Sequence, residues 1–264
     1  MLKQYSKIKI ESQTTNNLAL KMKLTILILI LFVTGCTTIP KNPNFKVKPG
    51  ESIGVLIDIP EKLTHTLIGT TIFNNSEKTY PYKWNLEAFA YNTITKSLRD
   101  KGYNVINLKE TNTSYQALKE ILIAKDNQWK INPKYTETYN TLQRLGIKSA
   151  IYFSSAKTVA FFQCGMSNCT DFYTESYGLF TRSFLGIKSN FAVAAFDNGI
   201  IITDPLAEVH YTVHKSFPLV NFKPIDFKNI SESEWSVVKK QIIKYIEEFS
   251  NNLPDLMSNS DTET

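Results

Sequence analysis

Residues 52–59 read Ser-Ile-Gly-Val-Leu-Ile-Asp-Ile, and this stretch decides the fold class. It is a nearly continuous apolar run that ends at Pro60, which is typical of a β-strand. A second β-branched stretch follows at residues 66–73 and stops at the turn-forming residues 74–76, Asn-Asn-Ser. We therefore expect the folded part of the chain to begin with two strands.

The clearest helix is expected over residues 85–102. Asn85 is placed to cap it, Glu87 lies early where the helix dipole favours an acid, and Gly102 ends it. One stripe at helical spacing collects its apolar side chains, namely Leu86, Phe89, Ala90, Ile94 and Leu98.

Strands and helices then alternate. The sequence predicts a strand at 103–108, helices at 114–124 and 134–145, and a strand at 149–153. Because parallel strands need crossover connections, this order predicts a sheet that is at least partly parallel.

The chain becomes rich in β-forming residues from residue 158 to about 213. Strands are predicted at 159–163, 171–177, 191–196, 200–203 and 208–213. Asp197-Asn198-Gly199 predicts a hairpin turn, because Asn and Gly accept positive φ. The last element is a helix over 232–249, capped by Ser231. We expect a single α/β domain over residues 51–250, with a mixed β-sheet flanked by helices and an antiparallel second half.

This order of elements resembles the periplasmic α/β domains of the curli-secretion lipoproteins and related outer-membrane assembly lipoproteins. The resemblance covers roughly residues 50–250. It rests on the order of elements alone, so it implies a fold and assigns no site residue.

Residues 24–33 form an apolar run of ten residues preceded by Lys21 and Lys23. A helix of this length rises only about 15 Å and cannot cross a hydrocarbon core of about 30 Å. The order of charged, apolar and small residues is typical of a secretory signal peptide. Residues 1–21 are either a long leading segment or lie upstream of a start at Met22.

Val33-Thr34-Gly35-Cys36, which follows, resembles the lipobox of bacterial lipoprotein precursors. The resemblance implies cleavage before Cys36, a diacylglycerol on its sulfur and a fatty acyl group such as palmitate on its amine. Residues 1–35 would then be a signal peptide and 36–50 a lipidated tether. At the other end, Pro254 lies beyond the last predicted helix, and the polar residues 251–264 are expected to form a flexible tail. Thr37, where an Asp favours the inner membrane, indicates the outer membrane facing the periplasm.

The chain left after residue 35 is nearly neutral, with 25 basic and 23 acidic residues. It lacks the clustered basic face of a nucleic-acid-binding protein. Apart from Cys36, its cysteines are Cys164 and Cys169, and in an oxidising compartment these two predict a disulfide. A metal or redox pair is the alternative, but there is no second cysteine pair and the spacing exceeds C-x-x-C.

Four catalytic or nucleotide-binding motifs are absent from the sequence: G-x-S-x-G, the P-loop, the dinucleotide fingerprint and H-E-x-x-H. We therefore expect no cofactor. His210 and His214 lie on a predicted strand, about 13 Å apart at about 3.3 Å per residue, too far to hold one metal ion. The acids Asp58, Asp197 and Asp204 lie at strand ends, where either catalysis or turn formation places carboxylates.

Two further segments leave alternatives open. Aromatic side chains beside the cysteines either pack in the core or form an exposed interaction surface: Phe172, Tyr173, Tyr177, Phe180 and Phe184. Residues 69–75 either form the edge of a ligand site or are a strand followed by a turn.

The main hypothesis is therefore a non-enzymatic lipoprotein of the cell envelope that binds another protein or copies of itself. The alternative is an anchored hydrolase or small-molecule-binding domain, whose pocket would gather Asp58 and Asp204.

Overall fold

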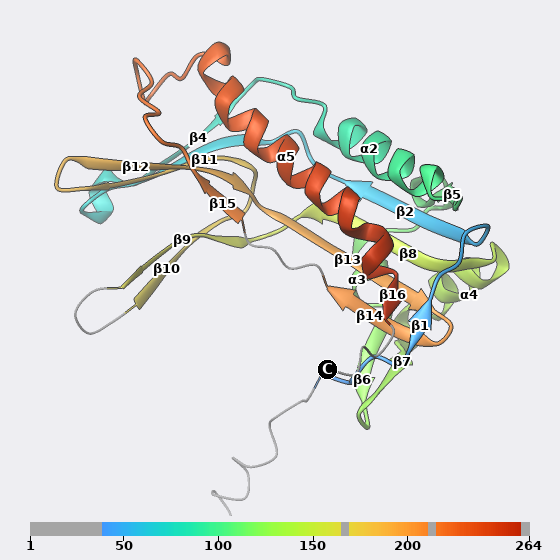
Figure 1. The fold of residues 1–264 in the computed structure, drawn as a ribbon. Helices are drawn as coiled ribbons and strands as arrows, with labels where there is room; N and C mark the ends of the chain where they lie inside the picture. The colour runs from blue at the N-terminus through green and yellow to red at the C-terminus, as the bar shows by residue number, and fades with distance from the viewer. Residues whose placement is uncertain (1–38, 165–168, 211–214, 260–264) are drawn as a thin grey trace, which may run out of the picture. The chain divides into compact units, whose positions relative to one another are not determined.

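The computed structural model describes residues 39–164, 169–210 and 215–259. The chain divides into two compact units, residues 1–40 and 41–264. All the helices and strands that the structure describes belong to the second unit (Figure 1).

Two five-stranded sheets form the framework of this unit. The first sheet has the order β14 (Leu206–His210), β13 (Phe196–Thr203), β8 (Ile147–Ser155), β2 (Ser52–Asp58) and β5 (Asn104–Asn107). The second sheet has the order β15 (Lys215–Pro218), β12 (Ile187–Ala194), β11 (Gly178–Phe184), β3 (Leu63–Ile68) and β4 (Ser76–Tyr80). In the first, β2 runs parallel to β5 and β8, whereas β13 is antiparallel to its neighbours.

The first sheet is buried on both faces because β2 is apolar at successive positions. Ile53, Val55 and Ile57 pack against α2 (Leu86–Asp100) and α5 (Glu232–Leu256). Leu56 faces the other way, toward a cluster with three elements: α3 (Tyr115–Lys119), α4 (Thr136–Arg144) and the hairpin β6 (Leu122–Lys125) with β7 (Gln128–Ile131). This explains why the strand reads as a run and not as an alternation.

The second sheet carries α5 on one face, against β11 and β12. The hairpin of β9 (Thr158–Cys164) and β10 (Cys169–Thr174) covers the other, where Phe161 and Phe172 pack near Phe180. Ala195 alone separates β12 from β13, so the chain passes directly from the second sheet to the first (Figure 1).

The predicted α/β fold with mixed parallel and antiparallel strands is confirmed. The structure has two five-stranded sheets where one sheet was expected. The second half is antiparallel apart from the parallel pairing of β11 with β3. In the described part of the chain, no helix is both long and apolar enough to span a membrane.

The predicted helix at 114–124 is wrong in its second half. Ser114 does cap α3, but the helix ends at Lys119 and β6 begins at Leu122. Asp126 and Asn127 both have positive φ, 54° and 57°, which makes the tight turn of a β-hairpin. The buried residues of this segment fit a helix or a strand equally well, so their spacing could not separate the two.

The boundaries expected for the tether and for the tail are wrong, because parts of both segments belong to the folded unit. β1 (Phe45–Lys46) pairs with β16 (Ser258–Asn259), and Phe45 and Met257 are buried in the core. The tail prediction rested on Pro254, which lies inside the last turn of α5. Pro254 has no amide hydrogen for the carbonyl of Ser250, which instead accepts a hydrogen bond from Ser97 Oγ at 3.0 Å.

The cap of α2 also differs from the prediction. Asn85 is in the left-handed region and makes no side-chain cap. The carboxylate of Glu61 replaces it, accepting from the amides of Trp84 and Leu86 at 3.0 and 3.1 Å. Short 3-10 helices also occur between these elements, at Ile72–Asn74, Leu108–Thr111 and Pro133–Tyr135.

Candidate functional site

Three loops meet at one end of the second sheet. They are residues 69–75 between β3 and β4, residues 184–187 at the turn between β11 and β12, and residues 219–228 before α5 (Figure 1, left). The parallel pairing of β11 with β3 places Arg182 opposite Ile68, which brings the first two loops together. We call these three segments the loop end.

Exposed apolar side chains concentrate at the loop end. Among the described residues, ten large hydrophobic side chains are exposed, and six of them lie here: Phe73, Phe184, Leu185, Ile187, Val220 and Ile225. Ile225 is 99% exposed and Phe73 is 90% exposed. Single exposed apolar residues are ordinary, but a concentration on adjoining loops marks an interaction surface.

A groove of about 730 Å³ lies between these loops, and a second hollow of about 470 Å³ adjoins it. The two share Gly186, Lys188 and Phe227. Their described lining residues include four lysines, at 78, 188, 223 and 228, and no carboxylate. The walls of the groove are therefore positively charged.

Local contacts position two of these lysines. Lys78 Nζ donates to the carbonyl of Lys228 and to Asn229 Oδ1, both at 2.7 Å. Lys188 Nζ lies 3.7 Å from the ring centroid of Phe227. Asp226, which adjoins the lining residue Phe227, accepts hydrogen bonds from the amide of Lys228 and from Asn229 Nδ2, which hold its pKa below the usual range.

The loops are fixed to one another. Arg182 donates to the carbonyls of Ile68, Gly69 and Ser183 from one guanidinium nitrogen. The amide of Leu185 donates to Thr70 Oγ1 at 3.0 Å. The loop end is thus a preformed surface.

A buried polar chain holds the third loop against the sheet. His65 Nε2 lies 2.9 Å from Thr181 Oγ1, Thr181 donates to Asn190 Oδ1 at 2.9 Å, and Asn190 donates to the carbonyl of Phe222. Burial lowers the pKa of His65 to about 4, and the charge of Lys188 adds to this effect. His65 is therefore neutral at pH 7.

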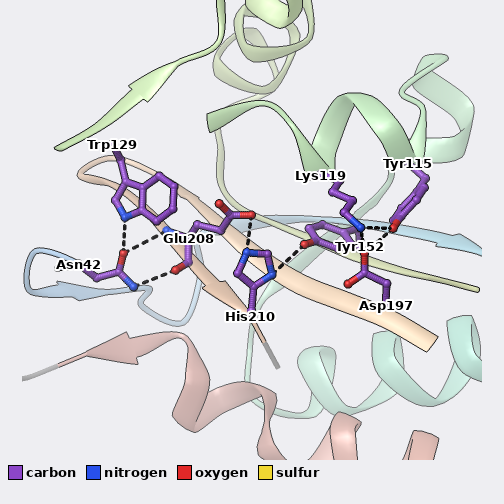
Figure 2. A network of polar contacts seen from close by, with 8 residues as sticks. All are labelled: Asn42, Tyr115, Lys119, Trp129, Tyr152, Asp197, Glu208 and His210. Atoms are coloured by element: carbon purple, nitrogen blue, oxygen red, sulfur yellow. Dashed lines mark hydrogen bonds and ion pairs between the residues drawn. The ribbon is translucent and has the colours of Figure 1, made fainter. Parts of the chain in front are cut away.

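A second polar network lies on the first sheet, beneath α3 and β6–β7 (Figure 2). Lys119 Nζ pairs with Asp197 at 2.6 Å, and Tyr115 also donates to Asp197. His210 lies 3.0 Å from Glu208 and 3.3 Å from Tyr152 Oη.

The same network reaches the start of the unit. Trp129 Nε1 donates to Asn42 Oδ1 at 2.6 Å, and Asn42 donates to the carbonyl of Glu208 at 2.8 Å. Tyr152 is fully buried, and this burial raises its pKa far above that of an exposed tyrosine. Its hydroxyl is therefore a poor acid at neutral pH, and we interpret the network as a structural tie between the elements that cover the first sheet.

The predicted turn Asp197-Asn198-Gly199 is wrong, because all three residues lie inside β13. Asp197 enters the network, and Asn198 donates to Tyr245 Oη at 2.8 Å in the core. A Cβ at position 199 would lie 2.5 Å from Tyr152 Oη, so the glycine is needed for packing.

The carboxylate pocket of the alternative hypothesis is not formed. Asp58 pairs with Ser154 at one end of β8, whereas Asp204 follows Thr203 beyond the pairing of Ile202 with Ser149. Five residues along a strand separate these ends by about 16 Å. Asp58 is exposed and the side chain of Asp204 is 75% exposed, so the prediction that they share a pocket is wrong.

The predicted aromatic surface is only partly exposed. Phe180 lies in β11, an inner strand of the second sheet, and Tyr177 directly precedes this strand. Both are fully buried, so their place in an interaction surface is wrong. Phe172 is half-buried beside the guanidinium of Arg182. Tyr173 and Phe184 are exposed, and Phe184 belongs to the loop end.

The other predicted positions are tested only in part. Cys164 and Cys169 lie opposite each other in the pairing of β9 with β10, so the backbone register agrees with a disulfide, which stays a prediction. Cys36 and His214 lie outside the described residues. No group of three His, Cys, Asp or Glu side chains suited to a metal ion occurs among the residues described.

Sequence reasoning singled out residues 69–75 as a possible ligand edge but missed the other two loops. Apolar residues beside turn formers were the available signal, as in Leu185-Gly186 and Pro224-Ile225. Such pairs are common in ordinary loops. Only tertiary contacts bring them together, namely the pairing of β3 with β11 for the β11–β12 turn and the hydrogen bond from Asn190 to Phe222 for the third loop.

Comparison with known proteins gives a distant likeness in structure only. No family model matches the chain, and no curated protein does. One similar solved structure is a Xanthomonas campestris protein of the DUF330 family, 7% identical over 82% of this chain and 88% of that one, with a TM-score of 0.37. Another is a neuraminyllactose-binding hemagglutinin homolog from Helicobacter pylori, 10% identical over 83% and 99%, with a TM-score of 0.23.

Proposed function

We propose that this protein is a lipid-anchored protein of the cell envelope whose folded unit binds a partner without catalysing a reaction. The anchor is an acylated Cys36, and the binding surface is the loop end. The observation that carries this proposal is the gathering of six exposed apolar side chains on three adjoining loops.

The rest of the unit supports the assignment by contrast. The acids and bases of the first sheet pair with one another, as Lys119 does with Asp197 and His210 with Glu208. At the loop end, the groove brings lysines and apolar side chains to the surface. An apolar surface of this kind is stabilised when a partner covers it.

Photo-crosslinking in cells tests the binding surface. A photoreactive amino acid replaces Leu185 or Ile225 in the full-length protein, and Leu145, an exposed leucine after α4, is the matched control. We expect light-dependent adducts, with a protein or with a lipid, at the two loop-end positions and none at position 145. Equal adducts at all three positions, or none at any, would contradict the proposal.

The anchor is tested by the intact mass of the protein extracted from host membranes. A chain that begins at Cys36 and is heavier by two or three acyl groups is expected. A full-length chain without added mass would overturn the assignment of the anchor while leaving the loop end to be judged by crosslinking.

A further inference from the structure

We propose that the partner of the loop end is a lipid surface that carries anionic headgroups. This inference rests on the proposed function, because it names the partner of the same surface. It follows from the shape of the apolar groups, the charge around them and the rigidity of the loops.

The apolar side chains project separately from each of the three loops. Phe73, Leu185 and Ile225 come from different loops and are 90%, 76% and 99% exposed. A protein partner would need a shaped pocket for each projecting side chain, whereas the interfacial layer of a bilayer takes up all of them without one. The separate projections therefore favour a lipid surface.

The charge around these side chains has the sign that anionic lipids attract. Lys223 and Lys228 are exposed, and no ion pair with a carboxylate is formed by either in the described part of the chain. Asp226 is the one carboxylate in the three loop-end segments, and its pKa is held below the usual range by hydrogen bonds from the Lys228 amide and Asn229 and by the charges of Lys228 and Lys78. Four lysines line the groove and the adjoining hollow, so they outnumber this carboxylate and the surface keeps a positive charge.

The backbone of the β11–β12 turn presents its apolar residue in an unusual conformation. Leu185 has a φ of 48°, in the left-handed region that a leucine rarely adopts. Its amide is held by Thr70, and its side chain gains little packing because it is 76% exposed. Strained positions of this kind are found where function needs them. Because the loops are already ordered, docking loses little conformational entropy.

The loop end is far from the place where the folded unit begins. The β11–β12 turn and the end of β13 are joined by β12, Ala195 and β13, which span about 50 Å at about 3.3 Å per residue. Asn42 is bonded near that far end, to the carbonyl of Glu208 on β14. A contact through the loop end is therefore made far from Asn42, where the folded unit begins. On the proposed function, this contact adds to the acyl anchor of Cys36, and two attachments hold a protein on a bilayer far better than one.

Vesicle binding tests the inference directly. The chain from residue 36 with Cys36→Ser carries no acyl group and keeps the whole folded unit, whose core comes from residues 45–257. Its co-sedimentation is measured with vesicles of phosphatidylcholine alone and with vesicles of equal parts phosphatidylcholine and phosphatidylglycerol. We expect binding to the second kind, weakened by added salt.

Substitutions then separate charge from insertion. Lys223→Gln and Lys228→Gln should each weaken binding about fivefold, as expected for a lysine near an anionic surface. Leu185→Asn with Ile225→Asn should weaken it tenfold or more, and asparagine accepts the left-handed backbone at position 185. Lys101→Gln and Leu145→Ser, exposed residues outside the loop end, are the matched controls and should bind as the parent does.

Equal binding to both kinds of vesicle, or binding that the double asparagine variant leaves unchanged, would overturn the lipid inference. If crosslinks from position 225 then lead to a protein, the loop end is still the binding surface and its partner is that protein. If vesicles and crosslinks both give nothing, the proposed function fails as well.

Discussion

The surroundings of the two sheets differ in how charged groups are paired and in how many apolar side chains are exposed. Around the first sheet, helices and a hairpin cover both faces, and charged groups there pair with each other, as in the Lys119–Asp197 contact. At the loop end of the second sheet, lysines line an open groove and six large apolar side chains face solvent. The first region pairs charged groups within the protein, whereas the loop end leaves large apolar side chains exposed to solvent.

On the function proposed above, this difference separates residues that maintain the fold from residues that bind a partner. Buried polar groups that find protein partners are what folding requires. Apolar side chains in water contribute nothing to folding, so a concentration of them points to binding. The contrast yields measurements in which the two regions should respond in opposite ways.

The sharpest test makes the same substitution in both regions. Phe153→Ala removes a fully buried ring that packs against Phe196, Tyr245 and Phe249, and should lower the free energy of unfolding by about 4 kcal/mol. Phe73→Ala removes a ring that is 90% exposed and should change it by less than about 0.5 kcal/mol. Urea unfolding followed by tryptophan fluorescence measures both.

The Phe73 variant is informative in a second way. It should lose vesicle binding while keeping the stability of the parent. A loss of stability as large as that of Phe153→Ala would mean that the loop end is part of the core and that the contrast between the regions is wrong.

The second test uses pH and the buried His65. Its pKa is lowered to about 4 from 6.5, so the folded protein favours the neutral ring. The unfolded chain then binds more protons between these values, and the stability that is present above pH 6.5 is lost as pH falls toward 4. The loss is about 3 kcal/mol over this window.

His65→Gln provides the control for this titration. It lacks the ionising ring, so its stability should change much less between pH 6.5 and 4.5, even if the variant is less stable throughout. The same steep loss of stability in the glutamine variant would assign the titration to other groups. The hydrogen bonds that run from His65 to Phe222 would then not be what acid disrupts.

The third test concerns two glycines, one in each region. Gly199→Ala places a methyl group 2.5 Å from Tyr152 Oη in the buried network and should cost about 2 kcal/mol. Gly186 in the β11–β12 turn has a φ of 83°, and a Cβ added there would meet nothing within 4 Å, so Gly186→Asn should cost less than about 1 kcal/mol. Thermal unfolding of the two variants side by side gives the ranking, and the reverse ranking would contradict the packing role of Gly199.

Gly199 also shows why part of the fold was not predictable from the sequence. Asp197-Asn198-Gly199 has the local preferences of a turn, yet each residue has a partner distant in the chain: Lys119, Tyr245 and Tyr152. The strand β2 and the helix α2 were predictable because their signals are local, in an apolar run and a helical stripe. Residues 121–122 were not, since hydrophobic spacing alone fits both structures.

The loop end was beyond sequence reasoning for a related reason. Residues 69–75 were recognised as a possible edge, but Leu185 and Ile225 are over a hundred residues further along the chain. Only the strand order of the second sheet makes them neighbours. Tyr177 and Phe180 illustrate the opposite error, because aromatic composition alone does not tell a strand face in the core from a surface.

The smallest expected effect comes from His210, and its sign should be opposite to that of His65. The hydrogen bond to Glu208 raises the pKa of His210, so the folded protein favours the charged ring. Its contribution is fully present below pH 6.5 and is lost as pH rises through the raised pKa. Because the ring is 45% exposed, solvent screens the pair, and a contribution of about 0.5 kcal/mol is expected. The free energy of unfolding of His210→Gln is subtracted from that of the parent at each pH, and this difference should decrease above pH 6.5. The same subtraction for His65→Gln should give a difference that increases from pH 4.5 to 6.5. Two curves of the same slope would mean that the two regions do not differ in how they hold their polar groups.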